Sequence, residues 1–266
     1  MLNQKLVVAV VRAVDVTNFL ATSDASLEAL KTANLLKGLP VNAFIFGQSG
    51  TGKKSLAKYI LPNAPVVDAS LHDELEDILS SNKTVIISNF DKIPNFDNFK
   101  VLVDKYEVRI IALANTVFNT EVIDRFFGIK VYLPPLSERK KDVKALTQRF
   151  LDEACTLFDI DQNIDIDISR INLDQNAHSI RRYVYMKVQF QGINEYELMD
   201  LMETYLKDKM GGNSDYRNYL YLYEAPLINA GLEKFKTQFQ LSDKLGLNRN
   251  TLRKKIAENK EYLNHE

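Results

Sequence analysis

The stretch GQSGTGKKS, residues 47–55, follows the apolar run NAFIF at 42–46. A glycine-rich turn between a strand and a helix lets backbone N–H groups converge on phosphate oxygens, and the helix N-terminus adds a favourable dipole. The glycines of this turn are Gly47, Gly50 and Gly52. Lys53 can reach the terminal phosphates of a nucleotide. The usual pattern ends in Ser or Thr, which helps to bind magnesium, but here Lys54 takes that place and Ser55 comes one position later. The stretch predicts a phosphate-binding loop, and an ordinary glycine-rich turn is the alternative.

The bulk composition narrows the class of protein. A chain of 266 residues with 45% hydrophobic and 26% charged residues fits one large domain, or a medium domain with a small one. The net charge of −1 argues against nucleic-acid binding by the whole surface and leaves a local basic patch open. Cys155 is the only cysteine, which excludes an intrachain disulfide and zinc sites built on several thiolates.

Metal and membrane signals are missing from the sequence. His72, His178 and His265 lie far apart without metal-ligand spacing, so no metal site is predicted. The apolar run at 6–11 is too short to span a bilayer and is followed by Arg12. With no signal peptide, membrane segment or disulfide framework, a cytoplasmic location and no membrane partner are expected.

Apolar, β-branched runs alternate with amphipathic stretches from residue 42 to about 135. Strands are predicted at 42–46, 65–68, 84–88, 109–114 and 129–133. Helices are predicted between them at 53–61, 70–80, 96–105 and 120–127. Strands separated by helices indicate a parallel sheet with helices packed on its faces. A further helix is predicted at 137–157, and 160–206 has a helical pattern around an acidic turn.

A change of composition follows the glycine-containing stretch DKMGGNSDY at 208–216, which is typical of a linker. Between residues 234 and 255 there are seven basic residues and one acid, Asp243. The excess of basic over acidic residues in this segment indicates a specialised C-terminal module.

Within that module, LSDKLGLNRNTLRKKI at 241–256 has the pattern helix, turn, helix. Gly246 can end the first helix in the left-handed conformation, and Asn248 is a good N-cap for the second. Leu252 and Ile256 would face a small core, so the polar residues project elsewhere, where Arg can read guanine and Asn can read adenine. The candidate DNA contacts are Asn248, Arg249, Asn250, Thr251, Arg253 and Lys254. A solvated basic helix in an interaction domain is the alternative.

Several segments in order resemble one family. GQSGTGKK is similar to the GESGTGKE of the NtrC-type AAA+ activators, which remodel RNA polymerase carrying sigma-54. EVRIIALAN at 107–115 resembles the strand that ends in the family's sensor residue, here Asn115. VYLPPLSERKKDV at 131–143 is close to the family's LPPLRER segment. SIRRYV at 179–184 resembles the segment whose arginine senses the γ-phosphate, here Arg181. The resemblance runs from about residue 20 to the C-terminus, and the sequence contains no receiver-type regulatory domain.

The resemblance implies an α/β fold: an AAA+ P-loop parallel sheet with helices on both faces and a helical lid, plus a small all-α helix-turn-helix domain. The implied boundaries are an N-terminal extension at 1–19, an α/β nucleotide-binding subdomain at 20–136, a helical lid at 137–207, a linker at 208–215 and a DNA-binding domain at 216–266. ATP or ADP is the candidate ligand. The implied nucleotide-binding residues are Gly47, Gln48, Ser49, Gly50, Thr51, Gly52, Lys53, Lys54, Ser55, Asn115, Arg125 and Arg181.

Two departures from the family argue against a working motor. Its Walker B strand ends in two acidic residues, and TVIISNFDKIP at 84–94 places Ser88 and Asn89 there, with Asp91 beyond the strand. Neither side chain can act as a carboxylate base, so little hydrolysis and poor Mg²⁺ binding are expected and no catalytic residue is assigned. Of two arginine fingers, Arg125 matches one and Asn119 occupies the place of the other. The family's GAFTGA loop, which touches the sigma factor, is missing, so sigma-54 contact is not expected.

The C-terminal segment GLNRNTLRKK resembles the Fis-type helix-turn-helix, and EAPLINAGLEKF at 224–235 resembles the preceding Fis helix. Fis modules pair through that region, which implies a homodimer on double-stranded DNA, and an oligomer of AAA+ domains is a further option. The leading hypothesis is a sequence-specific transcription regulator with a degenerate AAA+ domain. An ATP-hydrolysing enhancer-binding activator and a Fis-like architectural protein of the nucleoid are the alternatives.

Overall fold

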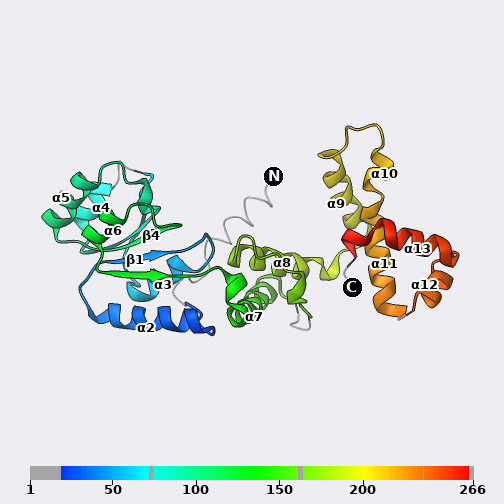
Figure 1. Ribbon diagram of the computed structural model, residues 1–266, viewed down its shortest axis with the longest axis horizontal. Coiled ribbons are helices and arrows are strands. Elements are labelled where there is room, and N and C mark those ends of the chain that lie inside the picture. Colours follow the sequence, from blue (N-terminus) through cyan, green and yellow to red (C-terminus); the bar gives the residue numbers. More distant parts are fainter. Residues whose placement is uncertain (1–18, 72–74, 161–163, 236, 264–266) are drawn as a thin grey trace. The chain divides into compact units, whose positions relative to one another are not determined.

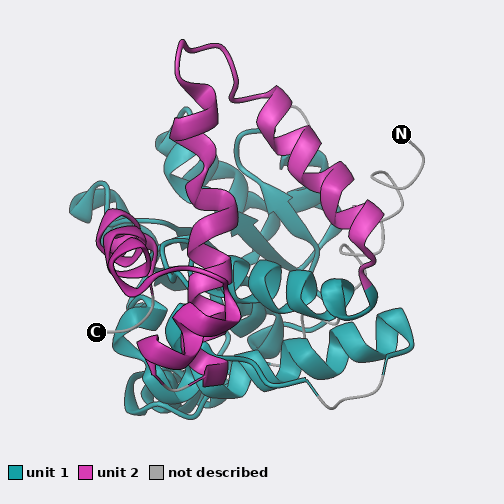
Figure 2. Ribbon diagram, turned by 90° about the vertical axis from the view of Figure 1, so that its right-hand side faces the viewer, with its two compact units in different colours: residues 1–192 teal, residues 193–266 magenta. Residues whose placement is uncertain are grey.

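The computed structural model describes residues 19–71, 75–160, 164–235 and 237–263. The chain divides into two compact units, the first ending at Gly192 and the second beginning at Ile193 (Figure 2). The predicted N-terminal extension lies outside the described residues except for Phe19.

The first unit is built on a five-stranded parallel sheet (Figure 1). The strands are β1 (Ala43–Phe46), β2 (Val66–Asp68), β3 (Thr84–Ser88), β4 (Arg109–Ala114) and β5 (Ile129–Tyr132), in the order β2-β3-β4-β1-β5. All five predicted strands are present, each within one residue of its predicted ends. Phe46 pairs in register with Ala114 on one side and Tyr132 on the other. Because all strands run the same way, the residues that follow Phe46, Ser88 and Ala114 meet at one edge of the sheet.

Helices cover both faces of the sheet, as predicted. The helices of one face are α2 (Asp24–Gly38) and α3 (Lys53–Ile60), and those of the other are α4 (Leu75–Ser81), α5 (Phe96–Tyr106) and α6 (Thr120–Phe126) (Figure 1). Successive strand residues point to opposite faces, so Phe44 packs in the core under α5 and α6 while Ile45 packs in the core under α2 and α3. Both side chains are fully buried. Strands buried on both faces explain the continuous apolar runs in the sequence.

Two helices that pack together complete the first unit, α7 (Lys140–Phe158) and α8 (Ala177–Gln189), with a shared core that includes Leu136 and Val184. The predicted helix at 137–157 begins at Lys140 because Leu136–Glu138 forms a 3₁₀ turn. The prediction of helix over 160–206 is partly wrong, since the chain from 164 to 176 contains only the 3₁₀ turn Ile168–Arg170.

The second unit contains only helices among its described residues: α9 (Glu195–Lys207), α10 (Asp215–Tyr219), α11 (Tyr221–Phe235), α12 (Gln238–Lys244) and α13 (Arg249–Glu258). Asn194 caps α9, accepting from the Glu197 N–H while the Glu197 carboxylate accepts from the Asn194 N–H. The unit boundary after Gly192 differs from the predicted linker at 208–215, so α9, which the sequence assigns to the lid, lies in the second unit. Its side chains Met202 and Leu206 line a pocket together with residues of α10 and α11. No helix in the described part of the chain is both long and apolar enough to cross a membrane.

Candidate functional site

The stretch 47–55 forms a loop between β1 and α3 whose three glycines have positive φ: 147° at Gly47, 77° at Gly50 and 102° at Gly52. A Cβ on Gly47 would lie 2.2 Å from the carbonyl oxygen of Leu133. A Cβ on Gly50 would lie 2.5 Å from that of Gln175. The loop therefore needs glycine at both positions for its backbone angles and for space.

Lys53 directs its ammonium group into the loop. Its Nζ donates to the carbonyl oxygens of Gly47 at 2.6 Å and Gln48 at 2.7 Å, and to Oδ1 of Asn115 at 3.1 Å. Asn115 follows β4 directly, so the order of the strands brings these two candidate residues together. Burial lowers the pKa of Lys53 to about 8. The loop thus holds a desolvated cation at the place where the sequence predicts terminal phosphates.

The other loop residues differ in accessibility. Gln48, Ser49 and Lys54 are exposed, Ser55 is half-buried in the first turn of α3, and Thr51 is buried with its hydroxyl donating to the Gln48 carbonyl at 2.8 Å. The exposed Lys54 stands where a magnesium-binding hydroxyl is usual. No group of three or more His, Cys, Asp or Glu side chains that could hold a metal ion occurs within the ranges that the structure describes.

Asn176, just before α8, joins the lid helices to the loop. Its Nδ2 donates to the Ser49 carbonyl at 2.9 Å and to Oε1 of Gln48 at 3.2 Å, while its Oδ1 accepts from the Leu136 N–H at 2.7 Å. The N–H of Ala177 donates to the Gly50 carbonyl at 3.1 Å. Asn176 is 1% exposed and has φ 52° and ψ −128°, a positive-φ conformation outside the left-handed helical region.

A buried ion pair, Arg139–Asp142, is hydrogen-bonded to the loop. Arg139 Nη2 donates to the Thr51 carbonyl at 2.7 Å, and its Nη1 lies 3.3 Å from Oδ2 of Asp142. Oδ1 of Asp142 accepts from both the N–H and hydroxyl of Thr22, from the Ser23 N–H and from the Ser26 hydroxyl, at 2.7–3.0 Å. Burial acts to raise the pKa of Asp142, but these hydrogen bonds outweigh it and the pKa lies below its usual value. The pair therefore joins α7, the loop and the start of α2.

Ser88 ends β3 and Asn89 follows it, the two residues that the sequence predicts at the Walker B positions. The Ser88 hydroxyl donates to the Val67 carbonyl at 2.9 Å, and Asn89, with φ 52°, donates from Nδ2 to both carboxylate oxygens of Asp68 at 2.9 and 3.0 Å. Hydrogen bonds from the Ser70 side chain and backbone and from Asn89 lower the pKa of Asp68. Asp91 lies beyond the strand, in a 3₁₀ turn, 3.5 Å from the ammonium of Lys92.

The two candidate arginines are engaged within the first unit. Arg181 Nη2 donates to Glu153 of α7 at 2.9 Å, and its guanidinium stacks on Phe150. Arg125 pairs with Asp97 at 2.7 Å. Asn119, which the sequence predicts at the position of the second arginine finger, is the N-cap of α6 and accepts from the Val122 N–H at 3.2 Å.

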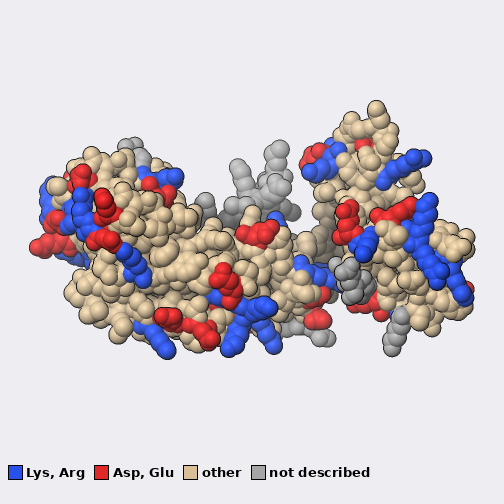
Figure 3. Space-filling model, in the orientation of Figure 1, with Lys and Arg blue, Asp and Glu red and all other residues tan. Residues whose placement is uncertain are grey.

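In the second unit, α12 and α13 are joined by a turn in which Gly246 has φ 63°. Leu241 of α12 and Leu252 of α13 are buried against Ile228 of α11. Asn248 caps α13, accepting from the Thr251 N–H at 2.8 Å. The side of α13 away from the core is exposed and carries Arg249, Asn250, Arg253 and Lys254, and Thr251 is half-buried. Figure 3 shows basic side chains gathered in a stripe over this part of the unit.

Not every basic residue of this segment faces outward. Lys255 donates to Glu224 of α11, whose other carboxylate oxygen accepts from Asn259 at 3.3 Å. Arg249 stacks on the exposed ring of Phe239. Lys255 thus supports the module from inside.

Sequence reasoning missed several residues that shape the site: Asn176, the Arg139–Asp142 pair and Asp68. The RxxD spacing of Arg139 and Asp142 on a helix start was the available signal, since residues three apart share a helix face. His178 also lies at the loop, where a Cβ on Gly50 would be 2.9 Å from its ring. No sequence pattern marks Asn176 or His178 as loop contacts.

No family model matches the chain. The DNA-binding transcriptional regulator NtrC of Azospirillum brasilense is 27% identical over 200 residues, which cover 58% of this chain and 42% of the relative. The chain thus spans less than half of that relative.

Two solved structures of NtrX from Brucella abortus share the fold. The complex with ATP has a TM-score of 0.56 at 15% identity, covering 97% of this chain and 73% of that one. The complex with ADP has a TM-score of 0.57 at 18% identity, covering 96% and 75%. The chain therefore carries an α/β domain that has the fold of NtrX, and it is similar in sequence to NtrC.

Proposed function

We propose that the chain is a sequence-specific DNA-binding transcription regulator whose degenerate AAA+ domain binds ATP or ADP without hydrolysing it. The observation that carries the proposal is the exposed basic side of α13, set on a helix whose other side is fixed by Leu252 in the core. A helix enters the major groove with one side and needs support from the other. Arg249 and Arg253 suit guanine, Asn250 suits adenine, and Lys254 suits a phosphate. The similarity to NtrC, a DNA-binding regulator, supports this role.

Nucleotide binding is supported by the glycine loop and by Lys53. A bound phosphate would replace the carbonyl oxygens of Gly47 and Gln48 as the partner of the Lys53 ammonium group. Its negative charge would then neutralise the positive charge of that group. NtrX, which has the same fold, has been solved with ATP and with ADP. Arg181 would join the phosphates only after leaving Glu153.

The absence of hydrolysis follows from the chemistry at the end of β3. Neither the Ser88 hydroxyl nor the Asn89 amide can take a proton from water at neutral pH, and losing a general base typically costs about 10²- to 10⁴-fold in rate. For the same reason Mg²⁺ is not expected to bind tightly. A second candidate function, ATP hydrolysis, is favoured by one observation: the carboxylate of Asp68 lies beside Asn89 at the same edge of the sheet.

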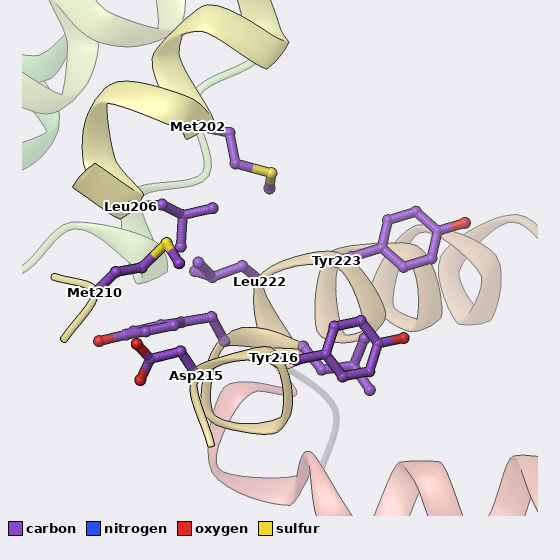
Figure 4. A pocket seen from close by; sticks show the side chains of 9 residues that line it. Met202, Leu206, Met210, Asp215, Tyr216, Leu222 and Tyr223 are labelled. Carbon is purple, nitrogen blue, oxygen red and sulfur yellow. The ribbon is translucent and has the colours of Figure 1, made fainter. Parts of the chain in front are cut away.

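A homodimer is proposed through the second unit. Helix α9 exposes most of its apolar side chains, which are Tyr196, Leu198, Met199, Leu201, Met202 and Tyr205. A groove of about 320 Å³ lies between α9 and the helices α10 and α11, with Met202, Leu206, Tyr216 and Tyr223 among its lining residues (Figure 4). Contiguous apolar surface of this kind is typical of an interface. An AAA+ oligomer through Arg125 is a further option, and sigma-54 contact is not proposed.

The DNA-binding proposal is tested by selecting preferred sites from random DNA and measuring affinity for the selected site and for unrelated DNA. Replacing Arg249 and Arg253 together with Ala should lower the affinity for the selected site at least about 30-fold, because each bidentate base contact contributes about 1–3 kcal/mol. The control replaces the exposed Lys140 and Lys141 of α7 with Ala, which removes the same charge. If the doubly substituted protein still prefers the selected site over unrelated DNA, α13 is not the helix that recognises the bases.

The nucleotide proposal is tested by measuring bound and hydrolysed ATP together, with and without DNA. Binding that is lost in Lys53→Ala, without turnover, is the expected result. Steady turnover that disappears in Asp68→Asn would replace this proposal with the ATPase candidate.

A further inference from the structure

The exposed ring of Phe239 is not explained by the core of the second unit. That core is formed by Ile228, Leu241 and Leu252 with partly buried neighbours, and Phe239 is not among them. Its side chain is 59% exposed on α12. The face of the ring is therefore available for contacts outside the core.

The ring instead contacts the first residue of α13. The guanidinium carbon of Arg249 lies 4.3 Å from the centroid of the Phe239 ring. Arginine stacks on aromatic faces through both its charge and its planar shape. The two partners come from different helices of the module, so the contact spans the turn between α12 and α13.

Both partners lie near the capped N-termini of their helices. Thr237 caps α12 by accepting from the Gln240 N–H at 3.2 Å, and the Ser242 hydroxyl donates to the Phe239 carbonyl at 2.8 Å. Asn248 caps α13 directly before Arg249. A long arginine side chain loses much rotamer freedom when it binds a base edge. A ring that already restricts the guanidinium removes part of that loss before binding.

We propose that Phe239 is a positioning residue that holds the Arg249 guanidinium oriented for bidentate recognition of a guanine. The inference rests on the proposed DNA-binding function and deepens it, because it predicts which arginine sets the strictest base preference. Arg253, on the same exposed side of α13, stacks on no aromatic ring among the residues that the structure describes.

The test uses the full chain and the DNA site that the wild-type protein selects. Affinities for this site, for its variants with each guanine replaced, and for unrelated DNA are measured for wild type, Phe239→Leu, Phe239→Tyr, Arg249→Ala and the double variant Phe239→Leu/Arg249→Ala. Phe239→Leu keeps apolar bulk without a π face, and Phe239→Tyr keeps the ring. Thermal melting of each variant checks that the fold is kept.

Phe239→Leu should lower the preference at one guanine position about two- to fivefold and leave binding to unrelated DNA unchanged. Phe239→Tyr should behave as wild type, and Phe239→Leu should have no further effect once Arg249 is Ala. An equal loss in the Arg249→Ala background would mean that Phe239 touches DNA itself and would overturn the inference, as would an unchanged base preference in Phe239→Leu. A wild-type protein that selects no site would instead refute the proposed function, and this inference with it.

Discussion

Lys53 makes the phosphate loop sensitive to pH. Its pKa of about 8 lies below the ordinary lysine value, so the ammonium group is charged below pH 8 and loses its proton as the pH rises above it. Affinity for ATP is therefore expected to be constant from pH 6.5 to 7.5 and to fall between pH 8 and 9.5. Fluorescence anisotropy of labelled ATP measures it. Lys53→Arg, which stays charged throughout, is the control for titration of ATP or of other residues. A wild-type affinity that is the same at pH 7 and 9.5 would contradict the prediction.

Loss of one partner of the buried Arg139–Asp142 pair should destabilise the fold more than loss of one partner of an exposed pair. Removing Arg139 alone leaves the Asp142 carboxylate in a site that is about 1% exposed, without its cation. Arg139→Ala should lower the free energy of unfolding of the first unit by about 3–5 kcal/mol. Lys130→Ala, which breaks an exposed pair with Asp124, should cost at most about 1 kcal/mol. Urea unfolding monitored by far-UV circular dichroism compares the two, and equal midpoints would show that the buried pair does not stabilise the unit.

At the scale of elements, α13 depends on α11 through Glu224. The carboxylate accepts from Lys255 and Asn259 of the C-terminal segment, and it is the least exposed carboxylate of the second unit's ion pairs within the described residues. Glu224→Gln should speed amide hydrogen exchange in α13 about fivefold, because a charge-assisted bond is weakened. Glu258→Gln, in an exposed pair with Lys254, is the matched control. An unchanged rate of amide hydrogen exchange in α13 of Glu224→Gln would show that Glu224 does not stabilise α13.

The elements also show what the sequence could predict and what it could not. The three central strands β1, β3 and β4 can be predicted within one residue because both of their faces are buried and leave a continuous apolar run, as in RIIALA at 109–114. Helix α9 was placed in the lid because its amphipathic pattern does not state which partner it packs on. At the site, the glycine loop and Lys53 follow from local pattern. Asn176 and Asp142 did not, because a buried polar residue is recognised only by the distant groups that hydrogen-bond to it.

At the scale of the whole molecule, the apolar side chains of α9 and the groove predict self-association. Sedimentation velocity at micromolar concentration should show a dimer, and Leu206→Glu should give a monomer because the charge would be desolvated in the interface. Glu203→Gln, an exposed change on the same helix, should leave the dimer intact. The monomeric variant should also lose preference for a palindromic over a half site. A Leu206→Glu protein that remains dimeric would place the interface elsewhere.

The contacts of Arg139 and Asn176 bear on how such a loop changes through evolution. Both side chains donate hydrogen bonds to backbone carbonyls of the loop, at Thr51 and Ser49. The conformation of the loop is therefore needed to satisfy these two buried polar side chains. A lineage that stopped using nucleotide would still lose stability if Gly47 or Gly50 mutated. Selection for folding alone would therefore be expected to keep glycine at these two positions, whether or not the loop still bound a nucleotide.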